Sequence, residues 1–296
     1  MRSRRGVAGL VLGTVVLAGC ATGTPEPGAA PPSTPSSAAP DAASSPDPAP
    51  ETEPPTPGTA PPAWLGARVL PETATGFGEV RRTPRALRTR RFTLPDTVGP
   101  LPGRGFASDV VAPAPRSVLR RSTWQPECPV TADELAWIRV AFWGFDDARH
   151  TGELLVATSV ADDVVRVFRD LYRARFPLEE MRVVTPPELD APPIGDGNNT
   201  TGFVCRPSVG GARFSEHAYG RAVDVNPFQN PYVRETDAGR VVLPELASAY
   251  LDRDRDAPGI MRPGGPVVTA FERIGWVWGG TYRTLKDYHH FSSTGL

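Results

Sequence analysis

The sequence predicts an α+β domain that follows a disordered, Pro-rich stalk. Apolar runs of strand length and of helical periodicity both occur after about residue 128, and they do not alternate in the β-α-β order of a parallel sheet. About half of the 35 prolines of the 296-residue chain lie in its N-terminal third, so the folded part is shorter than the chain length indicates. The net charge of -1 gives no electrostatic footprint for nucleic acid, and we expect no nucleic-acid partner.

The N-terminus is typical of an export signal. A basic start (Met1–Arg5) precedes an apolar run (Gly6–Ala18) that is too short for a comfortable transmembrane helix. The run ends in LAGC, at Cys20, which resembles a bacterial lipobox, whose cysteine is lipidated and becomes the mature N-terminus. We therefore expect residues 1–19 to be a lipoprotein signal peptide and Cys20 to anchor the protein to the outer face of the bacterial cell membrane. An ordinary secretory signal and an uncleaved anchor are the alternatives.

Composition divides the rest of the chain into three segments. Residues 20–63 consist of Pro, Ala, Ser, Thr and acidic residues and lack the apolar side chains needed for folding, so we expect an extended disordered linker. Residues 64–127 regain apolar side chains but stay Pro- and Arg-rich with little periodicity, which predicts an irregular arm. The compact domain is expected over residues 128–296.

Within this domain, the apolar pattern first predicts two strands and a helix. The runs Leu135–Phe142 and Gly152–Ala157 are mostly apolar, as in buried strands. Ser159, with Asp162 three residues later, fits a capping box, and apolar residues then recur on one helical face until Pro177 stops the helix. Beyond it, we expect short strands at Met181–Val184, Phe203–Arg206, Arg221–Asn226, Trp276–Trp278 and His290–Ser292, a turn-rich loop over 185–200, and helices at Leu243–Leu251 and Val267–Ile274.

Export into an oxidising compartment bears on the cysteines. If Cys20 is lipidated, Cys128 and Cys205 remain as an even pair, and a disulfide between them is plausible. Two buried free thiols are the alternative, because the sequence does not give the distance between them.

The four histidines include candidates for a metal site. His217 lies in a predicted turn that ends at Gly220, and Asp224 follows on a strand from which it can point back toward that turn. A second polar motif, Asp287–Phe291, brings two more histidines. Two imidazoles and one carboxylate would make the three protein ligands of a catalytic zinc ion. His150 has no neighbour at ligand spacing, and we expect it to be structural.

Two motifs resemble those of one peptidase family. The sequence SEHAYGRAVD (Ser215–Asp224) matches the SxHxxGxAxD signature of the D-alanyl-D-alanine carboxypeptidase and dipeptidase family of zinc peptidases, which includes VanY-type carboxypeptidases and phage L-alanyl-D-glutamate endolysins. The sequence WGGTYRTLKDYHHF (Trp278–Phe291) is similar to the endolysin-type second motif, W-G-G followed by D-x-x-H-F. Two motifs in the right order are a strong signal. The resemblance implies a hedgehog-like fold, with a small, mostly antiparallel sheet and flanking helices.

The resemblance also implies a ligand set. It makes His217, Asp224 and His290 the zinc ligands, and Zn2+ the cofactor. His290 rather than His289 stands three residues after the acid of the second motif, as the family pattern requires.

Four further residues take roles by resemblance. Asp287 matches the general base; many relatives have Glu there, and Asp resembles the endopeptidase branch. Arg206 matches, less closely, the arginine that binds the scissile carbonyl oxygen. Ser215 matches the serine of the first motif and is expected to support the metal site or to contact substrate. His289, in the second motif, is expected to pack in the interior or to contact substrate.

The sequence thus indicates an exported, monomeric zinc peptidase that hydrolyses the peptide stems of peptidoglycan. D-Ala-D-Ala and L-Ala-D-Glu bonds both remain candidates, because the shape of the pocket sets that choice. A zinc-containing binding module without peptidase activity is one alternative. An exported structural lipoprotein whose histidines cap a polar core is another.

Overall fold

The computed structural model describes residues 56, 58–74, 76–208, 211–237 and 239–295. All of the described residues belong to one compact unit, Glu53–Leu296. The expected signal peptide, Cys20 and most of the expected linker lie outside the described residues. Among the residues described, no helix is long and apolar enough to cross a membrane.

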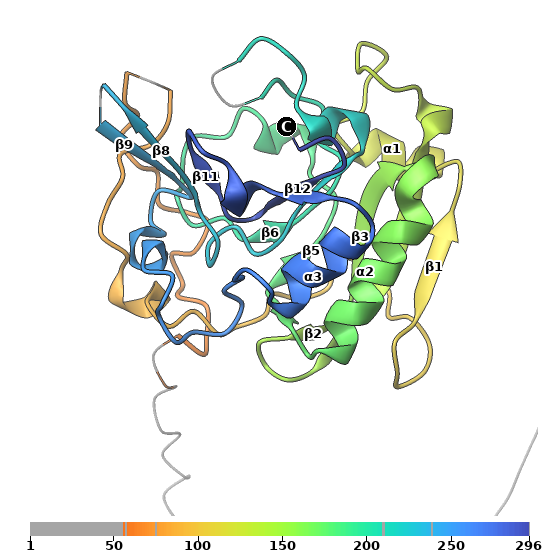
Figure 1. Cartoon of the computed structure of the whole chain (residues 1–296), viewed down its shortest axis with the longest axis horizontal. Helices are drawn as coiled ribbons and strands as arrows, with labels where there is room; N and C mark the ends of the chain where they lie inside the picture. The colour runs from red at the N-terminus through yellow and green to blue at the C-terminus, as the bar shows by residue number, and fades with distance from the viewer. Residues whose placement is uncertain (1–55, 57, 75, 209–210, 238, 296) are drawn as a thin grey trace, which may run out of the picture. The chain divides into compact units, whose positions relative to one another are not determined.

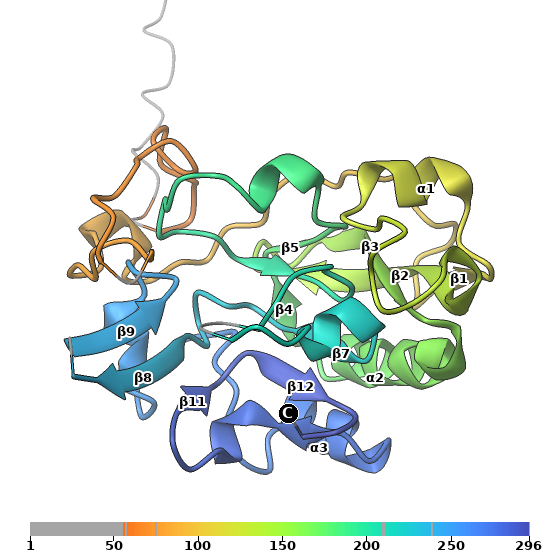
Figure 2. The ribbon, with the colours of Figure 1, turned by 90° about the horizontal axis from the view of Figure 1, so that it is seen from above.

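A four-stranded sheet forms one side of this unit (Figures 1 and 2). Strand β2 (Leu135–Gly144) pairs antiparallel with β3 (Arg149–Ala157) along its length, from Leu135 opposite Ala157 to Trp143 opposite Arg149. Strand β1 (Ser108–Val111) adds to the other edge of β2, and the short β4 (Pro177–Leu178) pairs with its last residues in parallel. The two long apolar strands that the sequence predicted, β2 and β3, therefore make up most of the main sheet. We call this sheet, together with helix α2 (Ala161–Arg173), the scaffold.

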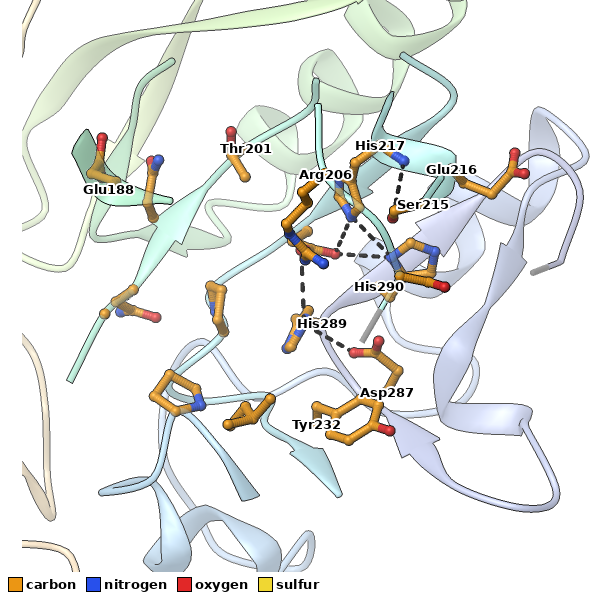
Figure 3. Close-up of a pocket in the computed structure, with 18 of the residues that line it drawn as sticks. Glu188, Thr201, Arg206, Ser215, Glu216, His217, Tyr232, Asp287, His289 and His290 are labelled. Atoms are coloured by element: carbon orange, nitrogen blue, oxygen red, sulfur yellow. Dashed lines mark hydrogen bonds and ion pairs between the residues drawn. The ribbon is translucent and has the colours of Figure 1, made fainter. Parts of the chain in front are cut away.

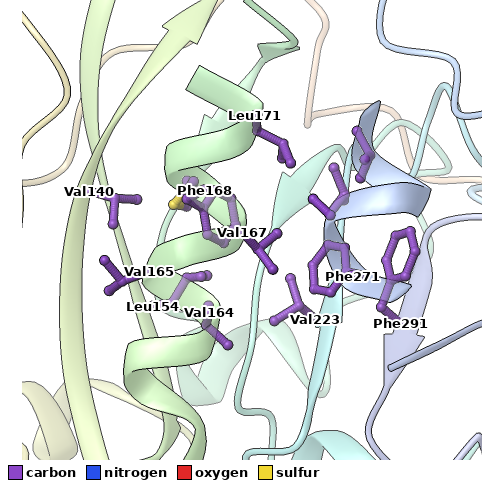
Figure 4. Packing of buried hydrophobic residues seen from close by; sticks show 14 of the residues in the cluster. Val140, Leu154, Val164, Val165, Val167, Phe168, Leu171, Val223, Phe271 and Phe291 are labelled. Carbon is purple, nitrogen blue, oxygen red and sulfur yellow. The ribbon is translucent and has the colours of Figure 1, made fainter. Parts of the chain in front are cut away.

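Two helices pack against one another beside this sheet. Helix α2 (Ala161–Arg173) contacts β2, and α3 (Pro266–Arg273) packs against α2 (Figure 4). Their apolar faces share one core, in which Phe271 stacks on Phe291 with 3.9 Å between ring centroids. The predicted capping box does not form. The chain leaves β3 through a 3-10 turn, Thr158–Val160, so α2 begins only at Ala161 and no side chain caps it.

Short strands make up the rest of the unit. A second sheet has the order β10–β12–β7 and a third the order β11–β8–β9, while β5 and β6 form a parallel pair. The bounds of these strands are β5 (Glu180–Met181), β6 (Asn199–Thr200), β7 (Ala222–Asp224), β8 (Tyr232–Thr236), β9 (Gly239–Leu243), β10 (Val277–Trp278), β11 (Lys286–Asp287) and β12 (His290–Ser292). Helix α1 (Arg116–Arg121) precedes β2, and 3-10 turns lie at Arg85–Leu87, Ala132–Glu134, Pro186–Glu188, Glu216–Tyr219, Ser248–Leu251 and Gly279–Thr281.

The segment 64–127, expected to be irregular, contains regular elements that belong to the folded unit. Strand β1 lies in the main sheet, and α1 packs in a core cluster that also includes Cys128. Farther upstream, Arg90 is 2% exposed and donates to both carboxylate oxygens of Glu179. A buried ion pair therefore fastens the irregular part of the segment to the domain.

Two other elements differ from the prediction. Phe203–Arg206 is not a strand. Thr201, just before it, forms an isolated β-bridge with Asp224, and the pairing does not continue into Phe203–Arg206. Leu243–Leu251 is not an α-helix. Leu243 is the last residue of β9, and Pro244 has no backbone N–H to donate. Within the segment, only Ser248–Leu251 forms a 3-10 turn. Its apolar side chains are buried against residues of the N-terminal arm instead. The fold is thus mixed α and β with several small sheets, compatible with the expected class.

Candidate metal centre

His217 is held by a short turn and by a backbone carbonyl. The 3-10 turn Glu216–Tyr219 begins at Ser215, whose hydroxyl accepts the His217 N–H at 3.4 Å. The turn ends at Gly220, whose φ of 66° suits glycine; a Cβ there would lie 2.4 Å from the Ala157 nitrogen. The His217 Nδ1 lies 2.5 Å from the carbonyl oxygen of Gly202, so its ring turns Nε2 toward the interior of the site.

The other two candidate ligands are neighbours across a pair of strands. Strands β7 and β12 pair antiparallel, with Asp224 directly opposite His290. Side chains of directly opposed residues project from the same face of a sheet, so the register alone brings these two together. From the sequence, we could say only that a metal site would require the segments of Asp224 and His290 to lie side by side.

The three side chains converge closely, and Figure 3 shows the two histidines of this group, His217 and His290. Asp224 Oδ1 lies 3.1 Å from His217 Nε2 and 3.0 Å from His290 Nδ1, and the two nitrogens are 3.2 Å apart. All three residues are less than one-tenth exposed. A tetrahedral zinc ion with bonds of about 2.0–2.1 Å places neighbouring ligand atoms about 3.3 Å apart. The three residues therefore form a group with the spacing of a metal site.

The chemistry of the ring atoms also fits a metal ion. Because the Nδ1–H of His217 donates to the Gly202 carbonyl, the Nε2 of the neutral ring carries a lone pair that faces the Asp224 carboxylate. Two electron-rich atoms at that distance repel unless a proton on Nε2 or a metal ion lies between them. Burial raises the pKa of Asp224, but His217 and His289 outweigh burial and hold that pKa well below its usual range. The carboxylate is therefore ionised and available as a ligand.

Asp287 and His289 form a second polar pair beside the three ligands. His289 Nε2 lies 3.0 Å from Asp287 Oδ1 and 3.8 Å from Asp224 Oδ2, and its Nδ1 lies 2.8 Å from the Asn230 carbonyl oxygen. Burial lowers the pKa of His289, but the Asp287 and Asp224 carboxylates outweigh it and raise that pKa to about 9. The protonated ring thus donates from Nδ1 to the Asn230 carbonyl oxygen and forms an ion pair with Asp287 that holds this carboxylate in place.

Arg206 and Ser215 lie on the loop that precedes the turn of His217. Both residues line the cleft described below, and the Ser215 N–H donates to the Arg206 carbonyl oxygen. The Arg206 guanidinium is partly exposed and donates to the carbonyl oxygen of Pro207. The structure joins Cys205 to Cys128 in a disulfide, which ties the start of this loop to the segment before β2. By contrast, His150 lies apart from these groups, between Asp96 and Asp146.

A long cleft passes over the candidate metal centre. Its volume is about 1270 Å³, and it is lined by residues of β5, the 191–199 segment, the 206–216 loop, β8 and the 282–290 segment. The three candidate ligands, Asp287 and His289 all belong to its wall. An extended chain is therefore able to lie across the site.

Sequence reasoning missed three groups that shape the site. The Gly202 carbonyl orients His217, the Asn230 carbonyl orients His289, and the hairpin of β8 and β9 places Tyr232 opposite Asp287. The two carbonyls carry no residue-type signal. The hairpin had one, since two short apolar runs flank Asp237 and Gly239, a pair typical of turns.

Comparison with known proteins gives one match. The family model of D-alanyl-D-alanine carboxypeptidase matches residues 209–293, which contain all three candidate ligands and the Asp287–His289 pair. No curated protein and no solved structure matched the chain. The segment that carries the candidate metal centre is therefore similar to the D-alanyl-D-alanine carboxypeptidase family of peptidases, the family that its two motifs resemble.

Proposed function

We propose that this protein is a zinc-dependent peptidase that hydrolyses the peptide stems of peptidoglycan, as a D-Ala-D-Ala carboxypeptidase or an L-Ala-D-Glu endopeptidase. The observation that carries the proposal is the convergence of His217, Asp224 and His290 on the wall of a long cleft, with Asp287 beside them. A family match over the same segment supports it.

The three ligands would hold the zinc ion. When bound, zinc supplies a Lewis acid that polarises a peptide carbonyl and makes water more acidic. The ligand set of two imidazoles and one carboxylate leaves a position open, as in catalytic rather than structural zinc sites.

The remaining residues would handle the proton and the substrate. Asp287 accepts a proton from the attacking water and returns it to the leaving amine, and His289 fixes the orientation of this carboxylate. Arg206, on the wall of the cleft, stabilises the negative charge that develops on the carbonyl oxygen. Ser215 positions the turn of His217 and faces the same cleft.

One observation favours a second function. The His289 ring forms an ion pair with Asp287, and an acid held by a cationic partner is a weaker base than a free one. A zinc-containing module that binds the cell wall without cutting it would tolerate this pairing. The two functions differ in whether turnover depends on Asp287.

The test combines metal analysis with an assay on purified peptidoglycan. We expect about one zinc ion per protein molecule and the release of peptide fragments that mass spectrometry identifies. Asp287→Asn should keep the zinc and lose about 10²–10⁴-fold in rate, the usual contribution of general acid–base catalysis. Glu235→Gln, which removes an exposed acid paired with Arg240 on the outer side of the hairpin, serves as the matched control. Equal release by Asp287→Asn and the wild type would leave only the binding function.

The N-terminal sequence supports a proposal on location. The LAGC sequence at Cys20 and the Pro-rich residues 20–63 suit a lipid-anchored domain carried away from the outer face of the cell membrane by a long spacer. Cys20→Ala should move the protein from the membrane fraction to the soluble exported fraction. Unchanged membrane attachment in this variant would point to an uncleaved anchor instead.

A further inference from the structure

Charge along the cleft is unbalanced in a way that the metal centre does not explain. Most of its carboxylates are already engaged: Glu180 and Glu188 both pair with Arg182, and Glu245 accepts the Gly78 N–H at 2.8 Å. The two acids of the metal centre face histidines. Four arginines of the cleft, in contrast, take part in no salt bridge among the described residues, and these are Arg206, Arg213, Arg221 and Arg234.

Arg234 is the arginine whose position relative to the reacting groups is fixed by strand register. Strand β11 places Asp287 directly opposite Tyr232 of β8, and Tyr232 lies beside Asp287 in Figure 3. Side chains two residues apart on a strand share a face, so Arg234 follows Tyr232 along the wall of the cleft. The rise of a strand puts it about 7 Å from the Tyr232–Asp287 pair.

The next residue of β8 shows that only one face of this strand is turned toward the cleft. Glu235 points away from the cleft and pairs with Arg240 of β9, and neither of these two residues lines the cleft. Arg234 and Arg240 therefore lie on one hairpin, both largely exposed, but only Arg240 has a carboxylate partner within the described residues.

Tyr232 completes a site for an anion. Tyr232 and Arg234 stand two residues apart on β8, and both line the cleft. Burial and the nearby Asp287 carboxylate raise the pKa of Tyr232, with Arg234 opposing, so the phenol stays neutral and keeps its O–H as a donor. A guanidinium fork next to a hydroxyl donor suits a carboxylate.

We infer that Arg234, with Tyr232, binds a carboxylate of the substrate within about two residues of the bond that is cut. This inference rests on the proposed function and narrows it. The preferred substrate is a stem peptide whose carboxylate at that place is free, and amidation of the same group weakens binding. Arg234 is thus a specificity-determining residue, and it takes no part in moving protons.

The test compares three synthetic stem pentapeptides: one with all carboxylates free, one amidated at the D-glutamate α-carboxylate, and one amidated at the C-terminus. For the zinc-loaded wild type, we expect one of the two amidations to lower kcat/KM about tenfold, the effect of one partly exposed charge-assisted hydrogen bond. Arg234→Gln should lower kcat/KM for the free peptide by the same factor and erase the difference between the free and amidated peptides. Arg240→Gln, the matched control, should keep the wild-type ratio.

Binding measurements separate this inference from the proposed function. Zinc-loaded Asp287→Asn, with and without Arg234→Gln, is titrated with the same three peptides, so that affinity is measured without turnover. A wild type that cleaves none of the peptides contradicts the proposed function, while the affinity ratios still decide the inference. Equal affinities for free and amidated peptides, or a ratio that survives Arg234→Gln, would overturn it.

Discussion

The two sides of this domain are built by different means. The scaffold around β2, β3 and α2 has strands of nine and ten residues and a continuous apolar core. The side that carries the candidate metal centre has strands of two to five residues, with buried polar groups between them. Apolar burial supplies most of the stability of a domain, whereas polar groups in a site are positioned at a cost. Stability and function should therefore respond to different substitutions.

The two sides meet along the segment that follows β6. The Gly202 carbonyl orients His217, the Phe203 N–H donates to the Leu155 carbonyl of β3, and Cys205 is bonded to Cys128. The long strand β3 thus fixes the position of the segment that orients His217. Substitutions on the site, on the scaffold and at this junction test whether stability and function depend on different sides of the domain.

The largest expected effect lies on the site side. Asp224→Asn removes one charged ligand, so zinc binding should fall below detection and the hydrolysis of peptidoglycan should drop at least about 10³-fold. The free energy of unfolding of the metal-free protein should change by no more than about 2 kcal/mol, because the scaffold core is untouched. Zinc content, fragment release and urea unfolding measure the three quantities. Retained zinc with full activity would remove Asp224 from the ligand set.

The scaffold side should show the opposite pattern. Phe168 of α2 is 1% exposed, and Phe168→Ala should lower the free energy of unfolding by about 3–5 kcal/mol. Zinc affinity of the folded protein should stay within about twofold of the wild type, which chelator competition measures. Arg173→Ala, at an exposed position on the same helix, is the control and should change stability by less than about 0.5 kcal/mol. A large loss of zinc affinity in Phe168→Ala would show that the two sides are not separable.

A substitution at the junction sharpens the comparison. In Gly202→Ala, the new Cβ would lie 2.4 Å from the Leu155 carbonyl oxygen, so the backbone has to shift and the carbonyl that holds His217 moves with it. Loss of such an orienting contact typically costs about 10–100-fold in metal affinity. Gly197→Ala meets nothing within 4 Å and serves as the control. Zinc affinity unchanged in Gly202→Ala would mean that His217 is oriented by its own turn alone.

The division also explains what the sequence could predict. The strand Leu135–Phe142 could be predicted because it is mostly apolar and mostly buried. His217 and Asp224 could be predicted because a turn and a short strand fix their spacing locally. Their proximity to His290 depends on the register between β7 and β12, which only the motif resemblance implied.

What could not be predicted depends on contacts between distant residues. The Leu243–Leu251 segment has apolar residues that fit a helix, yet they pack from a turn and a 3-10 turn against an arm more than 150 residues upstream. Thr83 and Leu246, which are 163 residues apart, are joined by a hydrogen bond. The partners of Arg90 and His217, a glutamate and a backbone carbonyl, are equally remote in the chain. Local periodicity contains no information on such pairs.

The smallest expected effect is a pH dependence confined to the scaffold side. His150 Nδ1 lies 2.9 Å from Asp96 and its Nε2 lies 3.1 Å from Asp146, so both nitrogens donate only when the ring is protonated. The hydrogen bond that His150 donates to Asp96 raises the pKa of His150 above 6.5; burial opposes this shift and Asp146 adds to it. A raised pKa in the folded state stabilises the protein fully below pH 6.5, and this contribution is lost as the pH rises through the folded-state value. Urea unfolding of metal-free wild type and His150→Gln across this range should give a stability difference that shrinks with increasing pH. Since the site histidines titrate equally in both proteins, a difference that stays constant or grows with pH would show that His150 does not bridge the two carboxylates as a cation.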